Sequence, residues 1–150
     1  MNFKFIFFLG LASILSSCND QQQEPAVKEK PDTKSAANCY RYINNNDTII
    51  LKTIAVNGFI TGTLVYNLYQ KDKNAGTIQG QMNGEILFAD YTFNSEGMQS
   101  VRPVAFKKTR ENFIEGYGET EIKNGKTTFK NKDSLNYTHS FLLMPFDCEK

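Results

Sequence analysis

The sequence has few of the residues on which most enzymes depend. Its 150 residues include a single histidine, His139, beside Thr138 and Ser140, where an ordinary strand or surface imidazole is expected. The Gly-x-Ser-x-Gly and Ser-x-x-Lys motifs of serine hydrolases, the phosphate loop and the dinucleotide fingerprint are absent. Histidine and cysteine are too few to build a metal site. We therefore expect a non-enzymatic protein with no metal and no cofactor, with an unrecognised hydrolase as the alternative.

Clustered positive charge and helical periodicity are missing too. No Lys/Arg cluster forms a basic stripe, and the formal net charge is +1. Nucleic-acid binding therefore lacks its usual electrostatic footprint, and attraction to a membrane has to come from a lipid. No segment of ten residues or more shows a convincing helical period, which favours a β fold.

The N-terminal residues have the parts of a signal peptide. Lys4 supplies a positive charge, and the apolar run 5–15 is too short to cross a ~30 Å hydrocarbon core, which needs roughly 20 residues. We expect residues 1–17 to be cleaved. The alternative is an ordinary secretory signal cut near Ser17, with Cys18 incidental.

The tetrapeptide Leu15-Ser16-Ser17-Cys18 resembles the bacterial lipobox. The resemblance implies that the Cys18 thiol receives diacylglycerol and that the new α-amine is acylated, for example with palmitate. Two or three acyl chains anchor a protein stably, since each buried methylene contributes about 0.8 kcal/mol. Because Asn19 is not the aspartate that retains some lipoproteins in the inner membrane, we expect the outer membrane of a Gram-negative cell envelope.

The rest of the chain divides into a tether and one domain. Residues 19–38 contain one branched aliphatic side chain and no aromatic one, so 18–38 is expected to be a lipidated cysteine followed by a disordered tether. Residues 39–150 are enough for one domain with a single core. If lipid occupies Cys18, the other two of the three cysteines, Cys39 and Cys148, remain as a pair that can close the domain as a disulfide. The alternative is two free buried thiols.

The domain pattern indicates antiparallel β structure. Three Asn-Gly pairs, at 57–58, 83–84 and 124–125, lie between β-rich runs and predict two-residue hairpin turns. Further reversals are expected at 71–76 and 94–97. The predicted strands are 47–56, 59–69, 77–82, 85–93, 99–108, 112–121, 126–130 and 139–145.

Glycines in the middle of strands favour a barrel. Gly62 shares a face with Ile60, Leu64 and Tyr66, and Gly80 shares one with its apolar neighbour at 78. Glycine at such positions lets a sheet bend sharply, as a small barrel needs. We therefore predict an all-β, up-and-down antiparallel barrel of about eight strands, with a two-sheet sandwich as the alternative.

Several segments between Gly62 and Gly118 resemble small lipoproteins of the Bacteroidota. They are Gly-Thr-Leu-Val-Tyr-Asn (62–67), Gly-Thr-Ile (76–78), Leu-Phe-Ala-Asp-Tyr-Thr-Phe (87–93), Ser-Glu-Gly (95–97) and Glu-Gly-Tyr-Gly (115–118). The resemblance implies a Gram-negative envelope but carries no activity. Asp47-Thr48-Ile49 and Asp133-Ser134-Leu135 resemble the pattern that this phylum uses for O-glycosylation, so Thr48 and Ser134 are candidate sites, with ordinary strand-edge residues as the alternative.

Two charged residues alternate in phase with apolar ones. Arg102 is in phase with Val104 and Phe106, and Glu115 with Phe113 and Tyr117, so both charges are expected to point inward. One interpretation is an ion pair of Arg102 with Glu115 or Asp90 that plugs the barrel, or a bulge that returns the charges to solvent. The other is a polar group at the base of a cavity. The candidate ligand-facing residues are then Tyr66, Arg102, Phe106, Glu115 and Tyr117.

We therefore expect an envelope lipoprotein, held at the membrane by its N-terminal lipid, whose barrel binds a small amphipathic ligand or a segment of a partner. The alternative is a protein-interaction module, such as an inhibitor or an accessory subunit of an envelope complex. Such a module should expose an aromatic or apolar patch in the loops near Tyr69 or Met98.

Overall fold

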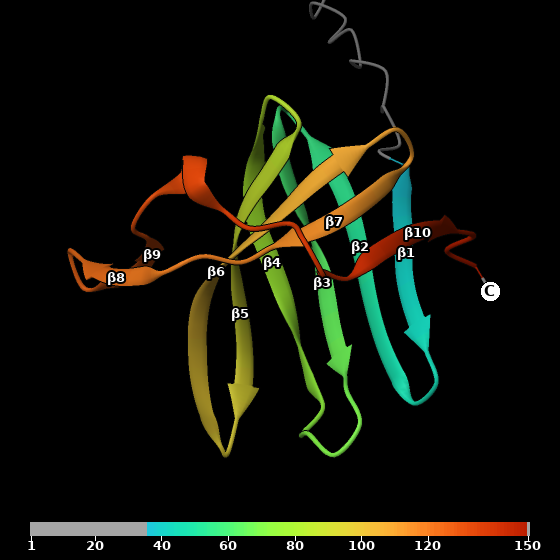
Figure 1. Ribbon diagram of the computed structural model, residues 1–150, viewed down its shortest axis with the longest axis horizontal. Helices are drawn as coiled ribbons and strands as arrows, with labels where there is room; N and C mark the ends of the chain where they lie inside the picture. The colour runs from blue at the N-terminus through green and yellow to red at the C-terminus, as the bar shows by residue number, and fades with distance from the viewer. Residues whose placement is uncertain (1–35, 150) are drawn as a thin grey trace, which may run out of the picture. The chain divides into compact units, whose positions relative to one another are not determined.

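The computed structural model describes residues 36–149, so the expected signal peptide, Cys18 and most of the expected tether lie outside the described part. The described chain is all-β, and eight strands form one closed antiparallel barrel (Figure 1). This confirms the predicted barrel, and the sandwich alternative is wrong. The barrel strands are β1 (Ala37–Asn44), β2 (Asp47–Val56), β3 (Phe59–Asn67), β4 (Asn74–Asn83), β5 (Ile86–Ser95), β6 (Met98–Thr109), β7 (Asn112–Gly116) and β10 (Leu142–Phe146).

The barrel has up-and-down topology. Each strand from β1 to β7 pairs with the next, and β10 pairs with both β7 and β1 to close the ring. The turns at 57–58 and 124–125 have positive φ at both residues, as a type I′ hairpin requires. At the third Asn-Gly pair β4 continues through Asn83, and Gly84 takes the first turn position with φ 58°.

The predicted strands differ from the observed ones near the beginning and near the end of the domain. Strand β1 was not predicted, because its core-facing residues are two tyrosines, Tyr40 and Tyr42, in a short stretch that is followed directly by polar residues. It also begins at Ala37, inside the expected tether. The predicted strand 112–121 leaves the barrel after Gly116.

The predicted strand 126–130 is not in the barrel. β9 (Lys126–Phe129) pairs with β8 (Thr120–Lys123) in a separate hairpin, which projects to one side in Figure 1. Ile122 of this hairpin is 80% exposed, so β8 offers no apolar face to the core. A 3₁₀ turn, Lys132–Ser134, follows before the chain returns as β10.

Two strand glycines have a steric role in the curvature. A Cβ at Gly62 would collide with the backbone oxygen of Lys52, and a Cβ at Gly76 with the backbone oxygen of Thr92. Both strand pairs therefore approach more closely than a side chain allows. The two glycines singled out in the sequence, Gly62 and Gly80, both lie where a Cβ would collide with the neighbouring strand, at the backbone oxygen of Phe88 in the case of Gly80.

The core lies inside the barrel. Its buried apolar residues come from every barrel strand, and the largest include Tyr91, Phe106, Ile49, Leu51, Leu64, Ile78, Leu87 and Leu143. A disulfide joins Cys39 on β1 to Cys148 just after β10, which confirms the predicted pairing and excludes two free thiols. Because the strands close on themselves around their own core, residues 36–149 contain everything that a domain needs to fold on its own.

We predict that Gly62→Ala lowers the free energy of unfolding by about 2 kcal/mol or more, because the added methyl forces β2 and β3 apart. Urea unfolding followed by far-UV circular dichroism measures the change. Thr63→Ala, on the exposed face of the same strand, should change stability by no more than roughly 0.5 kcal/mol. A stabilising Gly62→Ala, as expected for an unconstrained strand glycine, would contradict the steric role.

Candidate functional site

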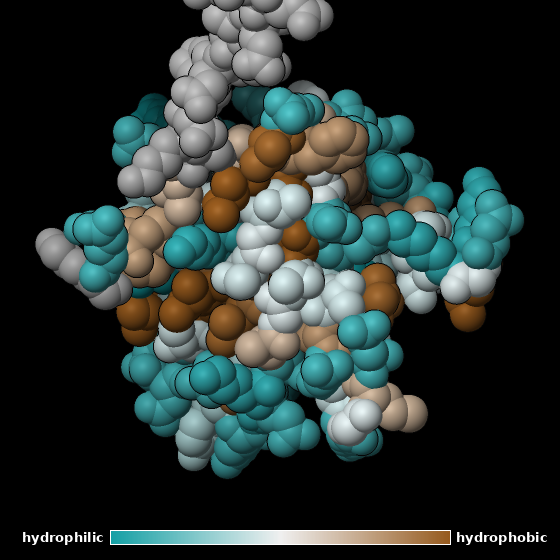
Figure 2. All heavy atoms as spheres, turned by 180° about the vertical axis from the view of Figure 1, so that it is seen from behind, coloured by the Kyte–Doolittle hydropathy of each residue, from teal (hydrophilic) through white to brown (hydrophobic). Residues whose placement is uncertain are grey.

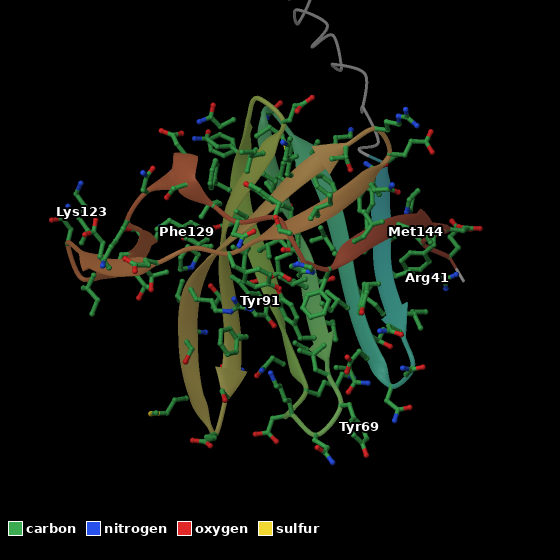
Figure 3. All side chains as sticks on the ribbon, in the orientation of Figure 1. Arg41, Tyr69, Tyr91, Lys123, Phe129 and Met144 are labelled. Carbon is green, nitrogen blue, oxygen red and sulfur yellow. A yellow bond between two sulfur atoms is a disulfide. The ribbon has the colours of Figure 1, made fainter. Side chains whose placement is uncertain are left out.

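A cavity of about 450 Å³ opens at the end of the barrel that carries the β3–β4 loop. Figure 3 shows Tyr91 within the barrel and Tyr69 on the loop at that end. The cavity is lined by Tyr66, Leu68, Lys71, Asp72, Asn74, Tyr91, Phe93, Arg102, Glu115, Tyr117, His139 and Phe141. Its volume falls in the range of roughly 300–1,000 Å³ that is usual for small-molecule sites.

Aromatic side chains form much of the wall. The ring of Tyr91 stacks on Phe93, with centroids 4.7 Å apart, and meets Tyr66 edge to face at 5.7 Å. Tyr91 and Phe93 alternate inward along β5, so the sequence period could have identified them. Phe141 precedes β10 and packs against Tyr42, which no local pattern predicts.

The polar side of the cavity is a cluster of four residues, Tyr66, Arg102, Glu115 and Tyr117, which we call the polar cluster. Glu115 is 1% exposed. Its Oε1 accepts a hydrogen bond from the Tyr66 hydroxyl at 2.5 Å, and its Oε2 accepts one from the Tyr117 hydroxyl at 2.8 Å. Tyr66 comes from β3, Glu115 from β7 and Tyr117 from the segment just after β7, so closure of the barrel brings these three residues together.

Burial dominates the titration of this cluster. It raises the pKa of Glu115, although the hydrogen bonds from Tyr66 and Tyr117 and the charge of Arg102 act in the opposite direction. Burial also raises the pKa of Tyr66 well above its usual range, and the negative charge of Glu115 adds to this. The pKa of Tyr117 rises for the same two reasons. Both phenols therefore stay protonated as donors at neutral pH.

Arg102 points inward as predicted, but the predicted ion pair is wrong. In the described part of the chain its guanidinium is within salt-bridge distance of neither Glu115 nor Asp90. The carbon Cζ instead lies 5.1 Å from the ring centroid of Tyr66 and 5.4 Å from that of Tyr91. Asp90 points outward and pairs with Lys126 at 2.5 Å.

Four of the five predicted ligand-facing residues, the members of the polar cluster, line this one cavity. The fifth, Phe106, is fully buried, contacts Phe113 in the core and does not line it. The alternative of a local bulge that returns the charges to solvent is wrong for Glu115, which stays in register with Phe106. The exposed His139 lies at the cavity rim with φ 57°, outside any strand.

The wall opens beside the polar cluster. Because the chain leaves the barrel after Gly116, a smaller cavity of about 180 Å³ forms between β6 and residues 116–120. It shares Arg102, Glu115 and Tyr117 with the main cavity. The polar cluster therefore lies between two openings.

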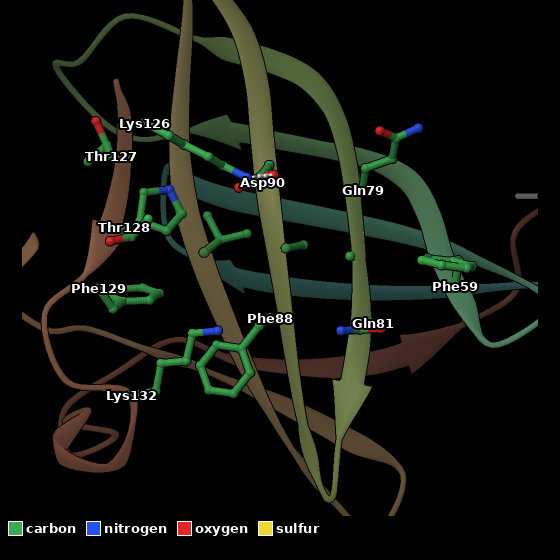
Figure 4. Close-up of a pocket in the computed structure, with 14 residues that line it drawn as sticks. Phe59, Gln79, Gln81, Phe88, Asp90, Lys126, Thr127, Thr128, Phe129 and Lys132 are labelled. Carbon is green, nitrogen blue, oxygen red and sulfur yellow. Dashed lines mark hydrogen bonds and ion pairs between the residues drawn. The ribbon is translucent and has the colours of Figure 1, made fainter. Parts of the chain in front are cut away.

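A cleft of about 300 Å³ lies on the outer surface, between the β8–β9 hairpin and strands β4–β6 (Figure 4). The ion pair of Lys126 with Asp90 crosses it, and the ammonium of Lys132 lies 4.8 Å from the ring centroid of Phe88. These contacts hold the hairpin segment against the barrel wall.

From behind, Figure 2 shows apolar side chains gathered in the middle of the face and framed by hydrophilic ones.

The modification candidates have separate places. Thr48 is half-buried in β2, and Ser134 is exposed in the 3₁₀ turn, where its hydroxyl donates to the backbone oxygen of Asn131 at 3.4 Å. Glycosylation at either stays a prediction. Cys18 lies outside the described residues.

Within residues 36–149, no group of three or more His, Cys, Asp or Glu side chains is arranged to hold a metal ion. The same residues include no helix that is long and apolar enough to span a membrane. No family model, curated protein or solved structure matches this chain. Its function has to be inferred from the chemistry of the site.

We predict that Glu115→Gln removes a pH-dependent cost from the folded state. Because the folded-state pKa of Glu115 is raised, the folded protein holds this proton more tightly than the unfolded chain does. The contribution is fully present below the unfolded-state value of about 4.3 and is lost as pH rises through the folded-state value. The unfolding free energy of the unmodified domain, relative to that of Glu115→Gln, should therefore fall with rising pH.

Urea unfolding of both forms from about pH 4 to pH 8 measures this difference. Glu121→Gln, at an exposed position of β8, is the matched control and should follow the unmodified domain across the range. A gap between the unmodified domain and Glu115→Gln that stays constant over this range would show that burial does not raise the pKa of Glu115.

Proposed function

We propose that this protein is a lipid-anchored envelope lipoprotein, non-enzymatic, whose barrel binds a small amphipathic molecule in the cavity at its open end. The observation that carries this is the cavity itself. It joins an aromatic wall of Tyr91, Phe93 and Phe141 to the polar cluster, of which Tyr66 and Glu115 are buried. A concavity that combines apolar walls with a few convergent polar groups is the usual form of a small-molecule site.

The described chain does not begin at the mouth of the cavity. Ala37 pairs with Ile54, near the β2–β3 turn, whereas the cavity opens beside the β3–β4 loop at the other end of the barrel (Figure 1).

A hydrolase is a second candidate, because Asp72 and His139 line the same cavity as Glu115. Both oxygens of Glu115 accept hydrogen bonds from phenols, which engage this carboxyl group in internal contacts. Among the described residues no hydrogen bond links His139 to either carboxylate. The arrangement favours binding over catalysis.

The protein-interaction alternative draws on exposed apolar side chains at the mouth end. Tyr69 on the β3–β4 loop is 61% exposed, and Met98 beside the β5–β6 turn is 70% exposed. They belong to separate loops rather than to one surface centred on a pocket. The cavity is the more specific feature, and ligand binding is therefore the first proposal.

We predict that the barrel domain, residues 36–150, binds the neutral apolar dye N-phenyl-1-naphthylamine with an increase in fluorescence. Leu68→Gln, which places a polar amide in the cavity wall, should weaken binding about tenfold, because one apolar contact is replaced by a group that needs hydration. Met98→Gln, outside the cavity, should leave the affinity unchanged. Weak binding lost only in Met98→Gln would favour the surface and contradict the cavity.

We predict that Cys18 carries the lipid. In a Gram-negative host, Cys18→Ala should abolish incorporation of labelled palmitate and move the protein to the aqueous phase of a detergent separation, since the thiol is the acceptor. Cys39→Ala is the control and should retain the label, although it loses the disulfide. Labelled palmitate that persists in Cys18→Ala would contradict anchorage at this residue.

A further inference from the structure

Arg102 is the residue of the cavity whose side-chain donors have no acceptor within the described residues. Its side chain is half-buried, and its Cζ lies over the rings of Tyr66 and Tyr91. A guanidinium carries five N–H donors, and none of them forms a hydrogen bond or an ion pair within residues 36–149. A cation–π contact places the charge but gives these donors no oxygen acceptor.

The nearby carboxyl group of Glu115 does not fill this role, because its hydrogen bonds come from Tyr66 and Tyr117 and it forms no ion pair with Arg102. Asp90 is on the outer surface with Lys126. The Arg102 donors are therefore available to an acceptor that enters through the cavity.

A second polar group beside Arg102 is also unpartnered. Tyr91 is 0% exposed, lines the same cavity, and its hydroxyl has no hydrogen-bond partner among the described residues. Tyr91 and Arg102 are directly opposite each other on β5 and β6. Two neighbouring side chains from adjacent strands thus present donors without acceptors at the same level of the barrel.

We propose that the cavity takes an amphipathic molecule with a carboxylate head group, and that Arg102 binds this carboxylate. The planar fork of a guanidinium matches the two oxygens of a carboxylate. The inference rests on the proposed ligand-binding function. The apolar part of the ligand lies towards the mouth, against Leu68, Phe93 and Phe141.

The charges around the cavity are compatible with a singly charged head group. Lys71, Asp72 and His139 line the rim, and Arg102 and Glu115 lie deeper. A single guanidinium matches one negative charge, whereas a doubly charged phosphate would need further cationic donors.

The test compares two molecules that differ in the head group. Decanoate and 1-decanol have the same chain length, and each competes with N-phenyl-1-naphthylamine for the barrel domain at neutral pH. Decanoate should displace the dye at a concentration about tenfold lower than decanol, the ratio expected for one charge-assisted contact. Equal displacement by the two would overturn the carboxylate head group while leaving the proposed cavity intact.

Arg102→Gln keeps a polar side chain but removes the charge. It should reduce the affinity for decanoate about tenfold more than it reduces the affinity for decanol or the dye, and far-UV circular dichroism reports whether the variant domain is folded. Arg102→Lys keeps the positive charge but lacks the planar fork of the guanidinium, and it should retain part of the preference for decanoate over decanol. Arg110→Gln, on the turn at the opposite end of the barrel, is the control and should behave as the unmodified domain.

Three results would oppose the inference in distinguishable ways. An equal loss of affinity for decanoate, decanol and dye in Arg102→Gln would make Arg102 a structural residue of the cavity wall. A decanoate preference that survives Arg102→Gln would place the head group elsewhere. Failure of the dye and both competitors to bind the unmodified domain would overturn the proposed function itself, and this inference with it.

Discussion

Closure of the sheet by β10, between β7 and β1, is the constraint on which the rest of the structure depends. An open sheet of the same strands would leave two unpaired edges and one exposed apolar face. Closure requires sharp curvature, and Gly62 and Gly76 permit it by letting neighbouring backbones approach without a Cβ between them. The disulfide of Cys39 and Cys148 lies beside this closing strand pair and ties it covalently.

Closure also creates the polar interior. Tyr66 and Glu115 are 49 residues apart in the sequence, yet their side chains form a hydrogen bond inside the barrel. A buried carboxylate is costly unless its oxygens have donors, and the two phenols supply one for each oxygen. Arg102 lies over the rings of Tyr66 and Tyr91 and lines the cavity together with Glu115.

The excursion between β7 and β10 adds a second layer to one side of the barrel. Tyr117 bonds to Glu115 where this segment begins, and Phe141 lines the cavity where it ends. Between these points the β8–β9 hairpin is attached to the wall by Lys126 and Asp90. Contacts at both ends couple the hairpin segment to the cavity. Residues 117–121 and 126–130 were predicted from the sequence to lie in barrel strands, whereas Tyr117 and Phe141, at the two ends of this excursion, line the cavity.

The sequence by itself determined the all-β class and the hairpin turns at 57–58 and 124–125, because turn chemistry is a local property. It also determined the pairing of Cys39 with Cys148, from the number of cysteines, and the inward direction of Arg102 and Glu115, from the strand period. Only the tertiary structure decided which strands close the barrel and which partners the inward charges take. Strand β1 was missed from the sequence, and the β8–β9 hairpin was not separated from the barrel, because strand pairing depends on residues that are distant in the sequence. All four residues of β8 are exposed, and their sequence does not indicate that β8 pairs with β9 alone. Glu115 accepts hydrogen bonds from two phenols instead of the predicted ion pair with Arg102, and this too depends on distances between side chains that barrel closure sets.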